Sequence, residues 1–109
     1  MTVEKFTSIS GFEALAMPSP ESEIEGAYVG DLLSWVMGKA GERNLWITIM
    51  TNVNIVAVAM LREISAIILA EGVEIDAEVI DAARLKGVNV LRTPLASYEA
   101  AKKIAEIIP

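Results

Sequence analysis

Four short polar segments follow the apolar strands that the sequence predicts, and they carry residue types able to hold a small ligand. In a parallel sheet the carboxyl ends of the strands and the amino ends of the following helices meet at one edge. Free backbone N–H groups at such an edge bind phosphate or carboxylate. The sequence therefore predicts one shallow site for a small anionic ligand, formed by Gly30, Asp31, Thr51, Asn52, Asn54, Glu71, Gly72 and Thr93.

The same residue types also have an ordinary structural role. Asn, Asp and Thr are common helix N-caps, and glycines such as Gly30 and Gly72 are common in turns. Caps and turns are the more frequent use of such residues. Both interpretations, a ligand site and a set of structural caps, stay open at the level of sequence.

The sequence contains no histidine and no cysteine. Within this chain that removes Ser-His and Cys-His nucleophiles, imidazole or thiolate zinc ligands, disulfides and iron–sulfur ligands. The phosphate-binding patterns Gly-x-x-x-x-Gly-Lys-Ser/Thr and Gly-x-Gly-x-x-Gly are missing too. Glu71, Glu74 and Asp76 could bind Mg²⁺ or Ca²⁺ weakly, but a solvated acidic turn explains them better. We expect no catalytic residues, no metal site and no cofactor.

Alternating strand and helix patterns position these segments. Apolar and β-branched runs predict strands over residues 12–17, 24–30, 45–50, 65–70 and 88–91, and the intervening patterns predict helices over 2–9, 31–39, 54–64, 76–86 and 97–107. Asp76 and Ser97 are expected to cap the last two helices, and Gly87 to end the first of these. Near-continuous apolar strands are typical of a parallel sheet covered by helices. The predicted fold is α/β: a single domain over residues 1–109, with a mostly parallel sheet of successive βα units flanked by helices.

Two predicted helices are more apolar than a helix that covers one face of a sheet should be. Ser34 is the single polar residue of segment 32–37, and segment 55–61 has none. A helix that is apolar all round must be covered on both sides, by its own chain or by a second copy. We favour a second copy, and predict a homodimer interface formed by Leu32, Leu33, Trp35, Val36, Met37, Ile55, Val58 and Ala59.

The composition agrees with self-association. The chain has 109 residues, 53% of them hydrophobic, and a mean hydropathy of +0.46, and so small a domain cannot bury that many apolar side chains alone. Its formal net charge of −6 argues against a nucleic-acid partner. The nearly apolar run 55–70 is broken by Arg62 and Glu63 and is shorter than the ~20 residues of a membrane span. We expect a cytoplasmic protein with neither nucleic-acid nor membrane partners.

The order of these segments from residue 12 to residue 107 resembles the DRTGG domain family, most strongly over 45–101. Residues 47–59 match the first strand–turn–helix unit of that family, 66–72 the second and 87–93 the third. The resemblance is to small stand-alone members. It implies a fold similar to the N-terminal domain of HPr kinase and a tendency to dimerise, whereas the P-loop domain that carries the kinase chemistry is missing.

The residues that name the family are mostly different here. Thr51-Asn52 stand near the place of the Asp-Arg pair, and the Thr-Gly-Gly is Ala70-Glu71-Gly72, so that Gly72 alone is shared. The resemblance implies a regulatory or structural role, as beside the CBS domains of pyrophosphatases. We predict a non-enzymatic regulatory or dimerisation domain that senses a small anionic ligand or a nucleotide. Two alternatives stay open: a dedicated small-molecule binding protein for nucleotides or phosphate, and an accessory subunit of a larger enzyme complex.

Overall fold

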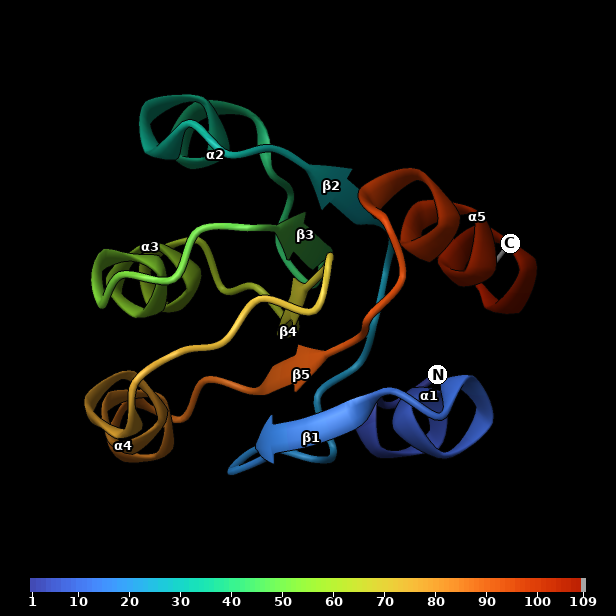
Figure 1. The fold of residues 1–109 in the computed structure, drawn as a ribbon, viewed down its shortest axis with the longest axis horizontal. Coiled ribbons are helices and arrows are strands. Elements are labelled where there is room, and N and C mark those ends of the chain that lie inside the picture. Colours follow the sequence, from blue (N-terminus) through green and yellow to red (C-terminus); the bar gives the residue numbers. More distant parts are fainter. Residues whose placement is uncertain (109) are drawn as a thin grey trace.

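Five strands form one sheet in the computed structural model, which describes residues 1–108 (Figure 1). Pro109, the last residue of the predicted domain, lies outside the described residues. The elements in chain order are α1 (Val3–Ser10), β1 (Glu13–Ala16), β2 (Ala27–Val29), α2 (Leu33–Lys39), β3 (Leu45–Thr48), α3 (Asn54–Leu61), β4 (Ala66–Leu69), α4 (Ala77–Lys86), β5 (Val90–Arg92) and α5 (Ser97–Ile107). Every predicted strand and helix is present, with bounds shifted by a few residues.

The strands lie in the order β1-β5-β4-β3-β2. The pairs β2–β3, β3–β4 and β4–β5 are parallel, and β1 is antiparallel to β5. This confirms the predicted mostly parallel α/β sheet. Because β1 runs against β5, the beginning of β1 lies at the same edge of the sheet as the end of β5.

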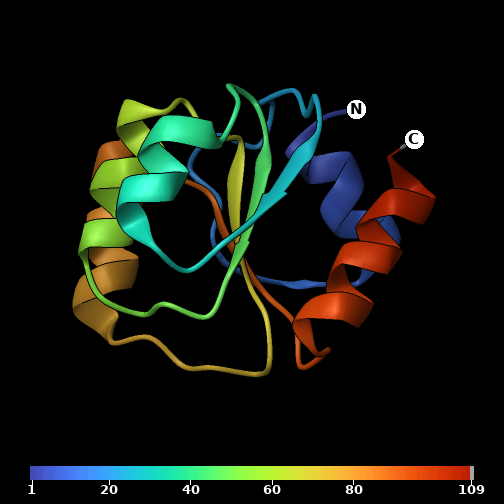
Figure 2. The same cartoon turned by 90° about the horizontal axis from the view of Figure 1, so that it is seen from above.

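Helices cover both faces of the sheet, with α2, α3 and α4 on one side and α1 and α5 on the other (Figure 2). The strand β4 shows how the core is divided: Ile67 and Leu69 pack with α2–α4, whereas Ala66 and Ile68 pack with α1 and α5. Both faces of this strand are fully buried, which explains its near-continuous apolar sequence. Each buried Ile or Leu side chain of this strand contributes ~1.5–3 kcal/mol through burial.

The structure corrects half of the predicted dimer interface. Val36, Ile55, Val58 and Ala59 lie in the core between the sheet and α2–α4, and Val58, the most accessible of them, is only 8% exposed. The helical period of 3.6 residues turns these side chains toward the sheet. They are therefore unavailable to a partner, and the prediction that they face one is wrong.

The helix ends differ from the predicted caps in two places. Asp76 occupies the N-cap position of α4, but its side chain makes no capping hydrogen bond. Gly87 ends α4 in the left-handed conformation, as predicted, with φ 73°. Ser97 is the first residue of α5 rather than its cap, and its N–H donates to Oε2 of Glu71 at 2.9 Å. Within residues 1–108 no helix is long and apolar enough to cross a membrane.

Candidate functional site

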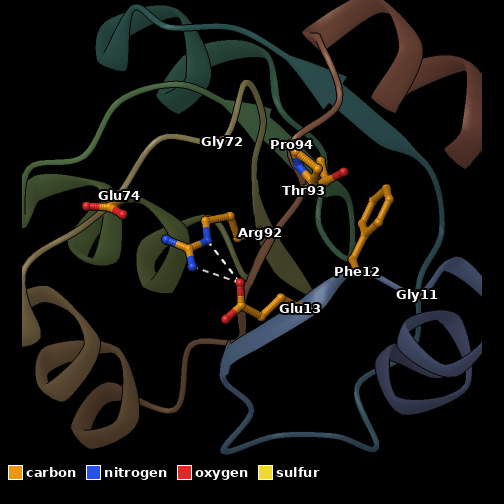
Figure 3. A pocket seen from close by; sticks show the side chains of 8 residues that line it. All are labelled: Gly11, Phe12, Glu13, Gly72, Glu74, Arg92, Thr93 and Pro94. Atoms are coloured by element: carbon orange, nitrogen blue, oxygen red, sulfur yellow. Dashed lines mark hydrogen bonds and ion pairs between the residues drawn. The ribbon is translucent and has the colours of Figure 1, made fainter.

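A pocket of about 370 Å³ opens at the carboxyl edge of the sheet, beside the end of β5 (Figure 3). Three chain segments meet there: the start of β1, the loop between β4 and α4, and the end of β5. Its lining residues are Gly11, Phe12, Glu13, Gly72, Glu74, Arg92, Thr93 and Pro94. The pocket thus lies at the edge where a ligand site was predicted.

An ion pair between Arg92 and Glu13 forms one wall of the pocket. The two residues are register partners on β5 and β1. Nε and Nη2 of Arg92 both donate to the same carboxylate oxygen of Glu13, at 3.0 and 2.8 Å. The Arg92 side chain is 26% exposed, and that of Glu13 is 58% exposed. The Arg92 side chain is therefore partly buried, whereas that of its carboxylate partner is mostly exposed.

Gly72 and Thr93 are the two predicted ligand residues that line this pocket. The N–H of Gly72 donates to the carbonyl of Thr93 at 3.0 Å, and the Thr93 hydroxyl accepts from the N–H of Leu95 at 3.2 Å. Gly72 has φ +67°, a conformation that costs other residues roughly 1 kcal/mol. These contacts hold the β4–α4 loop against the end of β5, so both residues shape the pocket through the backbone.

The predicted residues that follow β2 hold the fold together instead. Oδ1 of Asp31 accepts from the hydroxyl of Thr48 at 2.8 Å and from the N–H of Ile49 at 2.9 Å. The carbonyl of Gly30 accepts from Nε1 of Trp46 at 2.9 Å. Asp31 and Gly30 thus tie the end of β2 to β3, and neither lines the pocket.

The predicted residues that precede α3 also lie outside the pocket. The side chain of Asn52 accepts from the N–H of Asn54 at 2.9 Å, an ordinary turn contact at a helix start. Asn54 lines a separate apolar groove between α3 and α4, and Thr51 is half-buried. Glu71 binds the first N–H of α5. The contacts of Asn52 and Glu71 are those of turn and cap residues.

The pocket also contains residues that the sequence did not single out as ligand-binding. Glu74 was considered only as a weak metal ligand or part of an acidic turn, and Arg92 and Pro94 flank the predicted Thr93. Gly11, Phe12 and Glu13 carried no signal, because they enter the site through the pairing of β1 with β5. Within residues 1–108 no three acidic side chains are grouped so that they could hold a metal ion.

Replacing Asp31 by alanine tests its structural role. We expect the free energy of unfolding to fall by about 1–2 kcal/mol, because the hydroxyl of Thr48 and the N–H of Ile49 lose their charged acceptor. Urea denaturation measures this loss. Asp81→Ala is the matched control, since Asp81 is exposed and paired only with Arg84, and it should change stability by less than ~0.5 kcal/mol. Equal effects of the two substitutions would contradict the structural role.

The opposite edge of the sheet holds a second, polar hollow that includes Arg43 and Glu63. Nη1 of Arg43 donates to Glu25 at 2.6 Å. This hydrogen bond and the charge of Glu25 raise the pKa of Arg43 above its ordinary value. Arg43 is thus held as a cation by a carboxylate of its own chain, and its pair is solvent-exposed and of little energetic weight.

The sheet order, the helices on both faces and the pocket at the carboxyl edge define a small α/β domain of the open-sheet class. The chain belongs to the DRTGG domain family, whose model matches residues 33–107. This confirms the resemblance seen in the sequence. A comparison with curated proteins gives no match.

A solved structure shows the same fold. The chain is similar to the regulatory region of a Clostridium perfringens pyrophosphatase, which comprises CBS and DRTGG domains and was crystallised with its activator, diadenosine tetraphosphate. The TM-score is 0.77 at 18% sequence identity, and the match covers 99% of this chain and 47% of that chain. This chain therefore spans about half the length of that neighbour.

Proposed function

We propose that this chain is a non-enzymatic regulatory domain that binds a small anionic ligand or a nucleotide and passes the signal to a partner enzyme. The observation that carries this proposal is the pocket at the carboxyl edge, where three chain segments meet around the partly buried Arg92. Ligands of open α/β sheets bind at this edge. A ligand there contacts β1, β5 and the β4–α4 loop together, and so couples segments that are distant in sequence.

The comparisons support the regulatory part of this proposal. The neighbour in Clostridium perfringens is the regulatory region of an enzyme, and it was crystallised with an activator. This chain matches about half of that region and belongs to the same domain family. We propose that it acts likewise in the cytoplasm, beside an enzyme that supplies the catalytic chemistry.

A thermal-shift screen tests the binding function. Nucleotides, inorganic phosphate, small carboxylates and amino acids are each added to the full chain. A compound present at 100 times its Kd should stabilise the folded state by about 2.7 kcal/mol, because it binds the native state alone. We expect at least one of these compounds to raise the melting temperature. Flat melting curves with the whole panel would contradict a sensing role.

We also propose that two copies pair through the outer face of α2 and α3. These adjacent helices carry a group of large apolar side chains that remain exposed, and we call this group the α2–α3 face: Leu32, Trp35, Met37, Val53, Met60 and Leu61. Leu33, from the predicted interface, is half-buried beneath it and packs against the core. Large contiguous apolar patches on a monomer mark interaction sites, and a two-fold dimer covers the same patch on both copies.

Replacing Trp35 by aspartate should dissociate this dimer. Trp35 is 57% exposed, and a charge there would be buried without a partner in the interface. Sedimentation equilibrium at micromolar concentration should give a dimer mass for the wild type and a monomer mass for the variant. Tyr98→Asp, an exposed aromatic on α5 at the opposite face, should remain dimeric. A well-folded wild-type monomer at this concentration would contradict the proposal.

A dedicated small-molecule binding protein and an accessory subunit are the alternatives. The need for a partner enzyme distinguishes these two alternatives. A binding protein acts without a partner, whereas an accessory subunit changes the activity of the enzyme with which it assembles. The match to half of a longer regulatory region favours the accessory subunit.

A further inference from the structure

We propose that the pocket at the carboxyl edge takes a small zwitterion with one carboxylate and one ammonium group, the chemistry of a free α-amino acid. This inference rests on the proposed function, because it takes the same pocket as the ligand site. It differs in the ligand, whose carboxylate is balanced by an ammonium group. A ligand of this kind differs from a polyphosphate nucleotide, which carries several negative charges and no ammonium group.

The charges that line the pocket carry the first step of the argument. Its ionisable side chains are Arg92, Glu13 and Glu74, one cation and two carboxylates. In the view of Figure 3 the guanidinium of Arg92 lies between the two carboxylates. A polyphosphate needs an excess of cations, and this lining has an excess of negative charge. A ligand with one charge of each sign fits it better.

The backbone of the pocket gives a second, independent argument. Phosphate sites in α/β proteins use free N–H groups of a glycine-containing loop. Here the N–H of Gly11 donates to Thr7 and that of Gly72 to Thr93, at 3.0 Å each. The N–H of Phe12 donates to the hydroxyl of Ser10 at 3.2 Å. The N–H groups of both pocket glycines are thus occupied within the chain, so neither glycine offers a free N–H group to a phosphate.

Arg92 is the group that would hold the ligand carboxylate. Two of its N–H groups share a single oxygen of Glu13, and Nη1 makes no hydrogen bond to any of residues 1–108. A ligand carboxylate that presents both oxygens to the guanidinium makes two parallel charge-assisted hydrogen bonds. This bidentate contact is stronger than the present one, in which two N–H groups share one oxygen of Glu13. Glu13 is 58% exposed and can turn toward solvent when it is replaced.

The carboxylate of Glu74 then supplies the other half of the recognition. With the ligand carboxylate on Arg92 and Glu13 hydrated, the ammonium group of the ligand would lie against Glu74, which forms no ion pair within residues 1–108. Each charge of the ligand then meets one opposite charge of the pocket. The volume of about 370 Å³ is at the small end of ligand pockets, ~300–1,000 Å³, which suits a molecule of amino-acid size.

Isothermal titration of the full chain tests this inference. The probes are the twenty proteinogenic L-amino acids, inorganic phosphate and ATP, each at millimolar concentration. We expect at least one amino acid to bind, and its analogue without the amino group to bind at least tenfold more weakly. Glu74→Gln should also weaken binding of that amino acid, by threefold or more.

Two arginine variants complete the design. Arg92→Met should weaken amino-acid binding at least tenfold, whereas Arg84→Met, at an exposed arginine of α4 outside the pocket, should leave it unchanged. If circular dichroism shows that Arg92→Met is unfolded, Arg92→Lys takes its place, since it keeps the charge but loses the planar fork. Binding of phosphate or ATP that depends on Arg92, without amino-acid binding, would overturn the inference and leave the proposed ligand site standing. No binding by any probe would overturn both.

Discussion

Replacing Val58 by aspartate should unfold the chain. Val58 lies on the inner side of α3 and is 8% exposed, among the apolar side chains packed between the sheet and α2–α4. A carboxylate there would lose its hydration with no cation beside it, at a cost of several kcal/mol. Since a domain of this size is stable by only ~5–15 kcal/mol, we expect the variant to lose its cooperative melting transition. Circular dichroism during heating measures this.

Met60→Asp is the matched control on the same helix. Met60 is 43% exposed and belongs to the α2–α3 face, so an aspartate there stays hydrated in the monomer. This variant should fold and melt cooperatively but sediment as a monomer. A folded Val58→Asp monomer, together with a dimeric Met60→Asp, would reverse the assignment of the inner and outer sides of α3.

Replacing Asn89 by alanine should have the second largest effect on stability. Asn89 is 1% exposed and precedes β5. Its Oδ1 accepts from the N–H of Ser19 at 2.9 Å, and its Nδ2 donates to the carbonyls of Ser19 and Ser65 at 2.7 and 2.9 Å. The side chain thus joins the β1–β2 connection to the sheet. Its loss removes three hydrogen bonds and leaves backbone groups unpaired.

We expect Asn89→Ala to lower the free energy of unfolding by about 3–5 kcal/mol, from ~1 kcal/mol for each bond and a further penalty for the unpaired groups. Urea denaturation gives the number. Asn52→Ala is the control, because the exposed Asn52 makes one local bond to the N–H of Asn54, and it should cost less than ~1 kcal/mol. If the two alanine variants were equally stable, the anchoring role of Asn89 would be wrong.

The elements of the fold were predictable because their apolar patterns are strong. The strand β4 is buried on both faces, and its sequence is apolar throughout. The inner and outer sides of α3 were not predictable, because a helix without polar residues shows no 3.6-residue period. The prediction therefore placed Ile55 and Val58 at an interface, whereas the structure exposes Val53 and Met60 instead.

The site was predictable only where it follows the parallel strands. Thr93 comes directly after β5 and Gly72 three residues after the last residue of β4, at the edge where open sheets bind ligands. Glu13 lies 79 residues from Arg92 in the sequence, and the two meet because β1 pairs with β5. No local pattern encodes so distant a pairing. Asp31 and Asn52 have side chains suited to a ligand, but these side chains accept hydrogen bonds from nearby backbone N–H groups.

The ligand site at the carboxyl edge is tested most directly by amide chemical shifts of the ¹⁵N-labelled chain. The chain is titrated with a mixture of the twenty L-amino acids and, separately, with ATP. We predict shifts with the amino acids that cluster at residues 11–13, 72–74 and 92–93, the three segments that line the pocket. Unchanged spectra with both probes, or shifts confined to the α2–α3 face, would contradict a ligand site at this edge.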